Sequence, residues 1–151
     1  AAANGATAAI GKTGVGRVRL VGEGTYNPPL TTEWANYMKG FKKLHPKEDF
    51  AQPRISNTLW MLAKAMNKAK STDPLKVALV LEGMSHKSLW GDVVTMRKSD
   101  HQLQMPVRIS MHTDKNIEID FDNSGFGLLT ESTVSAANAS TPTVCKMKRP
   151  G

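Results

Sequence analysis

The sequence predicts an α/β fold, and a change of pattern partway along the chain carries that prediction. Between residues 31 and 83, apolar side chains recur every three or four positions, as they do on the buried face of an α-helix. After Gly83, apolar and polar side chains alternate, which is typical of half-buried strands. With 151 residues, the chain is long enough to enclose one hydrophobic core.

The first 30 residues contain one predicted strand among glycine-rich segments. Residues 6–10 favour a short helix that Gly11 ends. Residues 17–21 alternate charged and aliphatic side chains and predict a strand, after which residues 22–30 form a loop. The triplet GKT at residues 11–13 is not a phosphate-binding loop, because Ala6 stands where that motif needs its first glycine and no strand precedes it.

The first of three predicted helices begins near residue 31 and ends before Pro46. Thr31 or Thr32 can cap it, and proline stops a helix because it lacks a backbone N–H. Trp34 and Met38 lie on its apolar stripe, so we expect Trp34 in the core.

Two further helices are predicted between residues 54 and 83. The second covers residues 54–70, and the third has Pro74 in its first turn and ends near Gly83. Ser71 or Thr72 is the expected cap of the third helix. We expect Trp60 in the core and Trp90 partly exposed. The predicted buried stripe of the second helix consists of Ile55, Leu59, Leu62 and Met66.

Strands are predicted at residues 93–97, 107–112 and 117–121, and residues 127–130 could add a short one. The turn-forming residues 113–116 predict that 107–112 and 117–121 pair as a hairpin. In that hairpin Arg108 faces Glu118 or Asp120, which would join opposite charges across the strands. Residues 99–100 favour an Asx-type turn between two strands.

A formal net charge of +7 makes nucleic acid or an acidic protein a function class to weigh. The basic residues are spread along the chain, however, and Lys39, Lys42 and Lys43 lie on the polar side of a predicted helix. No motif of a nucleic-acid-binding module accompanies the charge. We therefore expect no nucleic acid, and a small basic domain that binds nucleic acid or an acidic partner is kept as the alternative reading.

No pattern in the sequence predicts catalysis, a metal site or a cofactor. The 4 histidines lack ligand-like spacing, and no G-x-S-x-G nucleophile motif accompanies the pair Asp100 and His101. Cys145 is the only cysteine, which excludes an internal disulfide and a cysteine-based zinc site. We expect a binding protein and not an enzyme.

The loop at residues 22–30 has the best binding chemistry in the chain. Glycines allow backbone to approach a ligand, and the loop follows a strand, where open α/β sheets bind ligands. An ordinary strand-to-helix connection is an equal alternative on these grounds. The candidate ligand-binding residues are Glu23 for an ammonium group, Tyr26 for an apolar side chain, and Thr25 and Asn27 for hydrogen bonds.

Several short motifs, taken in order, resemble one protein family. They are STDP at residues 71–74, LEGM at 81–84, VVTM at 93–96 and DHQLQMPV at 100–107, with the tail TVCKMKRP at 143–150. Their order is similar to the C-terminal part of periplasmic substrate-binding proteins of the branched-chain amino-acid type. The resemblance extends from about residue 10 to residue 150.

The resemblance implies a truncated fragment of the two-lobed, Rossmann-like type I periplasmic binding fold, with a C-terminal β-hairpin. Residues 1–49 would belong to the second lobe, 50–54 would cross a hinge at Phe50 and Gln52, and 55–151 would pack on the first lobe and the interlobe connection. The implied protein is periplasmic and captures a small amino acid, or a related carboxylate or amide, for the membrane permease of an ABC importer. Because the second helix would lack its usual partner, we also expect the isolated chain to form a homodimer.

Overall fold

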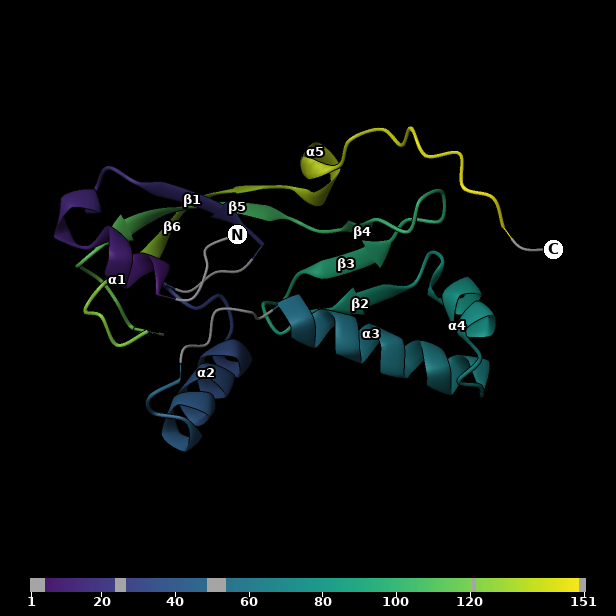
Figure 1. Ribbon diagram of the computed structural model, residues 1–151, viewed down its shortest axis with the longest axis horizontal. Helices are drawn as coiled ribbons and strands as arrows, with labels where there is room; N and C mark the ends of the chain where they lie inside the picture. Colours follow the sequence, from purple (N-terminus) through teal and green to yellow (C-terminus); the bar gives the residue numbers. More distant parts are fainter. Residues whose placement is uncertain (1–4, 24–26, 49–53, 121, 150–151) are drawn as a thin grey trace.

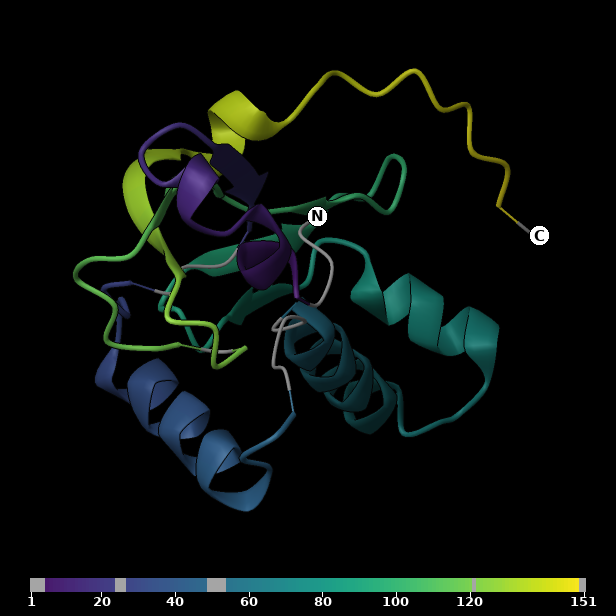
Figure 2. The ribbon, with the colours of Figure 1, turned by 60° about the vertical axis from the view of Figure 1, so that its left-hand side comes forward.

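The computed structural model describes residues 5–23, 27–48, 54–120 and 122–149. Its strands form two small antiparallel sheets with helices beside them, which confirms the predicted α/β class (Figures 1 and 2). In chain order the elements are α1 (Ala6–Ile10), the 3-10 helix η1 (Lys12–Gly14), β1 (Arg19–Gly22), α2 (Thr32–Leu44), α3 (Arg54–Ala69), α4 (Pro74–Leu81), β2 (Ser85–Lys87), β3 (Val93–Met96), β4 (Leu103–Gln104), β5 (Val107–Thr113), β6 (Gly127–Val134) and α5 (Ala136–Ala139).

The first sheet joins segments from opposite ends of the chain. Its order is β1-β5-β6, with β5 in the centre and both pairings antiparallel. A register shift between Ile109 and Ser110 interrupts the β5–β6 ladder. The sheet thus combines β1, which precedes residues 50–54, with β5 and β6, which follow them. The assignment of these segments to lobes stays a prediction.

The predicted hairpin of residues 107–112 with 117–121 is wrong. β5 pairs instead with β6, which is longer than the short strand predicted at 127–130. Residues 117–120 form no strand, and the backbone N–H groups of Glu118 and Ile119 both donate to the side-chain oxygen of Asn27 instead of joining a ladder. Arg108 consequently does not face Glu118 or Asp120 across a ladder, since β6 supplies its partner Thr133.

The second sheet has the order β2-β3-β4 and lies beside α3 (Figure 1). Strand β3 confirms the prediction at residues 93–97, whereas β2 and β4, of three and two residues, were too short to predict from alternation. Between β3 and β4 the backbone N–H of Gln102 donates to the carboxylate of Asp100 at 3.1 Å. This contact is the predicted Asx-type turn.

Helix starts follow the capping residues in the sequence. Thr31 caps α2 by accepting from the backbone N–H of Trp34 at 3.0 Å, as predicted. The cap of α4 is Asp73, and not Ser71 or Thr72, and it accepts from the N–H of Lys76 at 2.9 Å. Proline at the first position of α4 brings the carboxylate of Asp73 to the cap position.

The hydrophobic core lies between α2 and two loop segments. It contains Trp34, Met38, Trp90 and Ile119, and the rings of Trp34 and Trp90 meet edge to face with centroids 5.7 Å apart. Trp34 is core as predicted, but the prediction that Trp90 is partly exposed is wrong, because Trp90 is 3% exposed. The hydroxyl of Thr31 donates to the carbonyl of Leu89 at 2.5 Å and holds the Trp90 loop against α2.

Much of the apolar surface of helix α3 is exposed. Its buried face carries Asn57, Met61 and Ala65, whereas the predicted stripe is largely exposed, and so is Trp60 at 57%, contrary to its expected core position. Exposure of this stripe is the condition from which self-association was predicted, and the homodimer stays a prediction. In the stripe, Ile55 is 52% exposed, Leu59 60% and Leu62 40%, and Met66 is half-buried.

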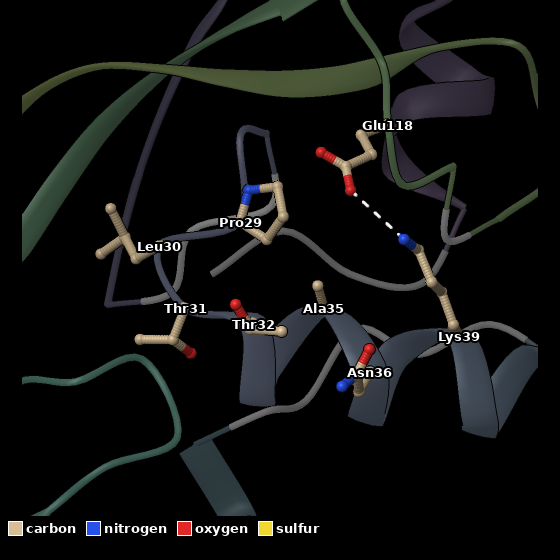
Figure 3. A pocket seen from close by; sticks show the side chains of 8 residues that line it. All are labelled: Pro29, Leu30, Thr31, Thr32, Ala35, Asn36, Lys39 and Glu118. Atoms are coloured by element: carbon tan, nitrogen blue, oxygen red, sulfur yellow. Dashed lines mark hydrogen bonds and ion pairs between the residues drawn. The ribbon is translucent and has the colours of Figure 1, made fainter.

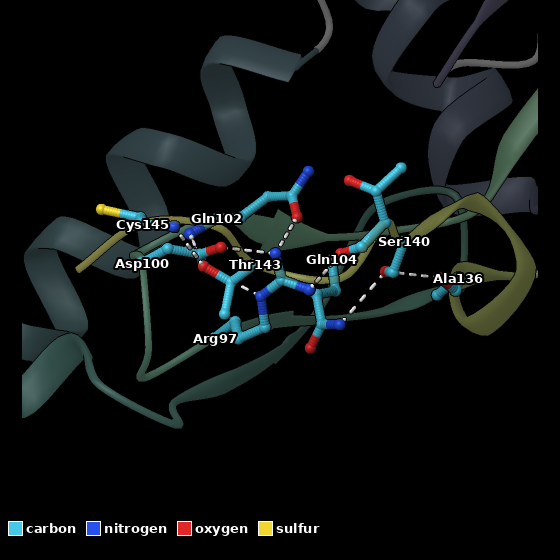
Figure 4. Close-up of polar contacts among 9 residues, drawn as sticks. Arg97, Asp100, Gln102, Gln104, Ala136, Ser140, Thr143 and Cys145 are labelled. Carbon is cyan, nitrogen blue, oxygen red and sulfur yellow. Dashed lines mark hydrogen bonds and ion pairs between the residues drawn. The ribbon is translucent and has the colours of Figure 1, made fainter. Parts of the chain in front are cut away.

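The C-terminal segment after β6 is tied to the second sheet (Figure 4). Arg97 forms a bidentate ion pair with Asp100, in which Nε lies 2.8 Å from Oδ1, and it also donates to the carbonyl of Thr141 at 2.7 Å. The amide of Gln104 donates to the hydroxyl of Ser140 at 3.1 Å. The Arg97–Asp100 pair therefore stabilises the turn before β4, and Arg97 also holds the C-terminal segment at Thr141.

Replacing Asp100 with Asn is expected to lower the melting temperature at pH 7. Arg97 holds the pKa of Asp100 well below its usual range, so ionised Asp100 stabilises the fold at every pH above the ordinary carboxyl pKa near 4. That stabilisation is lost as the pH falls below this value toward the folded pKa. The difference between wild type and D100N in thermal unfolding should therefore shrink from pH 5 to pH 2. The exposed Asp114→Asn is the matched control, and a pH-independent difference would contradict the assignment.

Candidate ligand-binding site

The loop that follows β1 is fixed at its first end by a buried arginine. Arg108 on β5 is 2% exposed, and its Nη1 donates to the carbonyl oxygen of Glu23 at 2.9 Å. The same guanidinium donates through Nη2 to Asp92, in the turn between β2 and β3, at 2.6 Å. One side chain thereby connects the loop, the first sheet and a turn of the second sheet.

The other end of the loop is fixed by Asn27, which is 0% exposed. Its side-chain oxygen accepts from the N–H groups of Glu118 and Ile119 at 2.8 Å each. Its amide nitrogen donates to the carbonyls of Ile119 and Leu128 at 3.2 and 3.4 Å. The backbone carbonyl of Asn27 also accepts from Thr130 of β6 at 2.9 Å. Because every polar group of the side chain has a backbone partner, Asn27 supports the loop structurally.

A cavity of about 320 Å³ opens where this loop enters α2 (Figure 3). Residues 29–32 form one side, and Ala35, Asn36 and Lys39 of α2 form another. Glu118 completes the lining, and its carboxylate lies 3.4 Å from Lys39 Nζ. Hydroxyl, amide, ammonium and carboxylate groups thus meet in a small open space, which suits a small polar solute.

Only part of the predicted binding set lies in the described residues. Glu23 and Asn27 are described and lie at the two anchored ends of the loop. Thr25 and Tyr26 lie outside the described residues, as do the predicted hinge residues 50 and 52. Ligand contact by Glu23, Thr25, Tyr26 and Asn27 stays a prediction.

Sequence reasoning missed three residues that shape this region. Lys39 was assigned to a solvated face, and its side chain is indeed 62% exposed although it reaches Glu118. Arg108 and Asp92 carried no local signal, because the chain brings them together from separate elements. Throughout the described part of the chain, no cluster of three or more His, Cys, Asp or Glu side chains has the arrangement of a metal site.

Comparison with known proteins gave structural neighbours only. No family model and no curated protein matches the sequence. A leucine-, isoleucine-, valine-, threonine- and alanine-binding protein from Brucella ovis, in a closed conformation, superposes with a TM-score of 0.81 at 21% identity, over 98% of this chain and 39% of that one. An ABC-type branched-chain amino acid transporter from Rhodopseudomonas palustris superposes with a TM-score of 0.69 at 20% identity, over 92% of this chain and 36% of that one.

The two neighbours define the architecture. This chain spans about two fifths of the length of each, and both are named for binding or transport. None of the helices within the described ranges combines the length and the apolar character needed to cross a lipid bilayer. The order of elements, the two small antiparallel sheets and the superposition over nearly the whole chain show that it has the fold of part of a type I periplasmic binding protein.

Proposed function

We propose that this chain is part of the solute-binding component of an ABC importer. The observation that carries the proposal is the superposition of 98% of the chain on the leucine-, isoleucine-, valine-, threonine- and alanine-binding protein, with a TM-score of 0.81. A receptor of this kind captures solute by closing two lobes and performs no covalent chemistry. The proposed ligand is a small amino acid, or a related carboxylate or amide, and the proposed partner is a membrane permease that meets the loaded receptor in the periplasm.

The loop between Glu23 and Asn27 is the part of the chain proposed to face the ligand. Arg108 holds the carbonyl of Glu23, and the backbone of Glu118 and Ile119 holds the side chain of Asn27, so the two described ends of the loop are fixed. Preorganisation of this kind reduces the entropy that binding must offset. In the proposed mode the carboxylate of Glu23 pairs with the ammonium group of the ligand, and Thr25 and Tyr26 complete the contact.

In the proposed receptor the partners of the ligand's carboxylate lie outside this loop. The chain spans 39% of the Brucella ovis protein, so much of the neighbour's fold has no counterpart in this chain. In the proposed receptor the second set of contacts comes from a facing lobe, with residues 50–54 as the crossing between lobes. Closure about that crossing would bring the two sets of contacts together.

The test is a ligand-induced stabilisation screen, followed by titration calorimetry, on a protein in which this chain is joined to a facing lobe. Leucine, alanine and glutamine are compared with their N-acetyl derivatives, which keep the carboxylate and lose the ammonium charge. We expect at least one free amino acid to bind, its N-acetyl derivative to bind at least about tenfold more weakly, and Glu23→Gln to produce a similar loss.

The matched control is Glu48→Gln, an exposed glutamate outside the loop, which should leave affinity within twofold. The proposal fails if none of the free amino acids stabilises the protein in which this chain is joined to a facing lobe, or if E23Q and E48Q bind alike.

A further inference from the structure

A second cavity, of about 280 Å³, meets α2 only at Glu33 and shares no lining residue with the first. It is bounded by the start of α2, the middle of α3, and strand β2 with the turn that follows, and Figure 1 shows α3 running along β2. The side chains that carry its chemistry are Glu33, Trp60, Lys64, His86, Lys87 and Ser88.

The cavity has a positively charged end. Lys64 Nζ lies 3.0 Å from Nδ1 of His86, and His86 is 8% exposed. Burial, reinforced by the charge of Lys64, lowers the pKa of His86, so the imidazole is neutral at pH 7 and its Nδ1 accepts from the ammonium group. The ammonium group keeps two further N–H donors for another acceptor, and Lys87 adds a second cation to the lining.

A buried hydroxyl in the lining has no partner. Ser88 is 3% exposed, and its Oγ is fully enclosed and makes no hydrogen bond within the described residues. Burying a hydroxyl without a partner is costly, so such a group in a native fold calls for an explanation. Because Oγ has no surface open to the cavity, a ligand oxygen could pair with it only if the lining shifted, so the hydroxyl is not counted among the proposed ligand contacts.

The wall beside these polar groups is aromatic. Trp60 is 57% exposed although it lies on an amphipathic helix, and it lines the cavity together with Leu89. An exposed indole beside a cationic group offers a flat apolar face against which a ring can stack. The volume is near the lower end of the range for ligand pockets, which limits the ligand to a small molecule.

We propose that this cavity binds a small aromatic carboxylate, whose carboxylate pairs with Lys64 while its ring lies against Trp60. Glu33 at the α2 side adds a negative charge that disfavours a dianionic ligand. The lining contains no residue of the loop after β1, so the test of this site is separate from the test of the proposed import function.

The test uses the whole chain, benzoate as the probe, and the side-chain N–H signals of its three tryptophans in nitrogen-15 NMR spectra. Trp60→Phe removes the Trp60 signal from the spectrum and thereby identifies it. The other two tryptophans, Trp34 and Trp90, are buried. We expect saturable shifts of the Trp60 signal with benzoate. Benzamide has the same shape without the charge and should bind at least about tenfold more weakly.

Substitutions distinguish the proposed contacts from general charge effects. Lys64→Gln should weaken benzoate binding about tenfold or more, whereas Lys68→Gln, one turn along the same helix and outside the lining, should leave it within twofold. Ser88→Ala removes an enclosed hydroxyl that has no partner within the described residues, so it should fold normally and leave benzoate binding within about twofold. Equal binding of benzoate and benzamide, equal effects of K64Q and K68Q, or shifts confined to other tryptophans would each overturn the proposal.

Discussion

Replacing Asn27 with alanine is expected to destabilise the chain by about 3 kcal/mol or more, because it leaves several buried backbone groups without partners. The side chain is 0% exposed, accepts two backbone N–H groups and donates to two backbone carbonyls. Each buried polar group left unpaired costs about 1–3 kcal/mol, and water reaches such a site poorly. Urea unfolding monitored by far-ultraviolet circular dichroism measures the loss.

Two further variants show whether the hydrogen bonds, and not mere size, carry this effect. Asn27→Asp keeps the accepting oxygen but puts a second oxygen against the carbonyls of Ile119 and Leu128, so it should also destabilise strongly. Its loss should be larger at pH 7 than at pH 4, since protonation removes the charge and restores a donor. Asn67→Ala, at an exposed position of α3, should change stability by less than about 0.5 kcal/mol. A loss of under about 1 kcal/mol for N27A would contradict the structural role given to this residue.

The same residue explains why the sequence misled on the strand at residues 117–121. Alternation of Ile117, Glu118, Ile119 and Asp120 is a good local signal for a strand. The backbone N–H groups of Glu118 and Ile119 donate to the side chain of Asn27, which lies 91 and 92 positions earlier in the sequence. Ile119 also enters the core beside Trp34. A hydrogen bond to so distant a residue cannot be recognised from the local alternation of apolar and polar side chains.

Elements governed by local chemistry were predicted well. The cap of α2 by Thr31, the extent of α3 and the proline that begins α4 depend on residues within one turn of each other. Which face of a helix is buried depends instead on what packs against it. The periodicity therefore identified the apolar stripe of α3 correctly. The expectation that this stripe is buried is wrong, since Leu59 is 60% exposed.

The sequence indicated where the candidate site lies, but not how its residues are arranged. Glycines after a strand drew attention to residues 22–30, and Glu23 lies at the start of that loop. The arginine that holds its carbonyl is 85 positions away, and the segment that clamps Asn27 is 91 or more positions away. Only the folded chain brings these groups together.

Replacing Arg108 with methionine is expected to cost about 3 kcal/mol of stability, near the lower end of the range for breaking a buried ion pair. Arg108 is 2% exposed, and the substitution leaves Asp92 without its cation and the carbonyl of Glu23 without its donor. The lower end applies because the Asp92 side chain is 19% exposed, so water offsets part of the loss. Urea unfolding again provides the measurement.

A double-mutant cycle with Asp92→Asn isolates the pair from the loss of the arginine's other contacts. If the two charges stabilise each other, the double variant should lose less than the sum of the single variants, by about 1 kcal/mol or more. Arg19→Met is the matched control, because Arg19 is on the neighbouring strand β1 and pairs with Glu131 at 2.7 Å, with its side chain 48% exposed. It should lose less than about 1 kcal/mol. Strict additivity in the cycle, or equal losses for R108M and R19M, would mean that the Arg108–Asp92 pair does not join the two sheets.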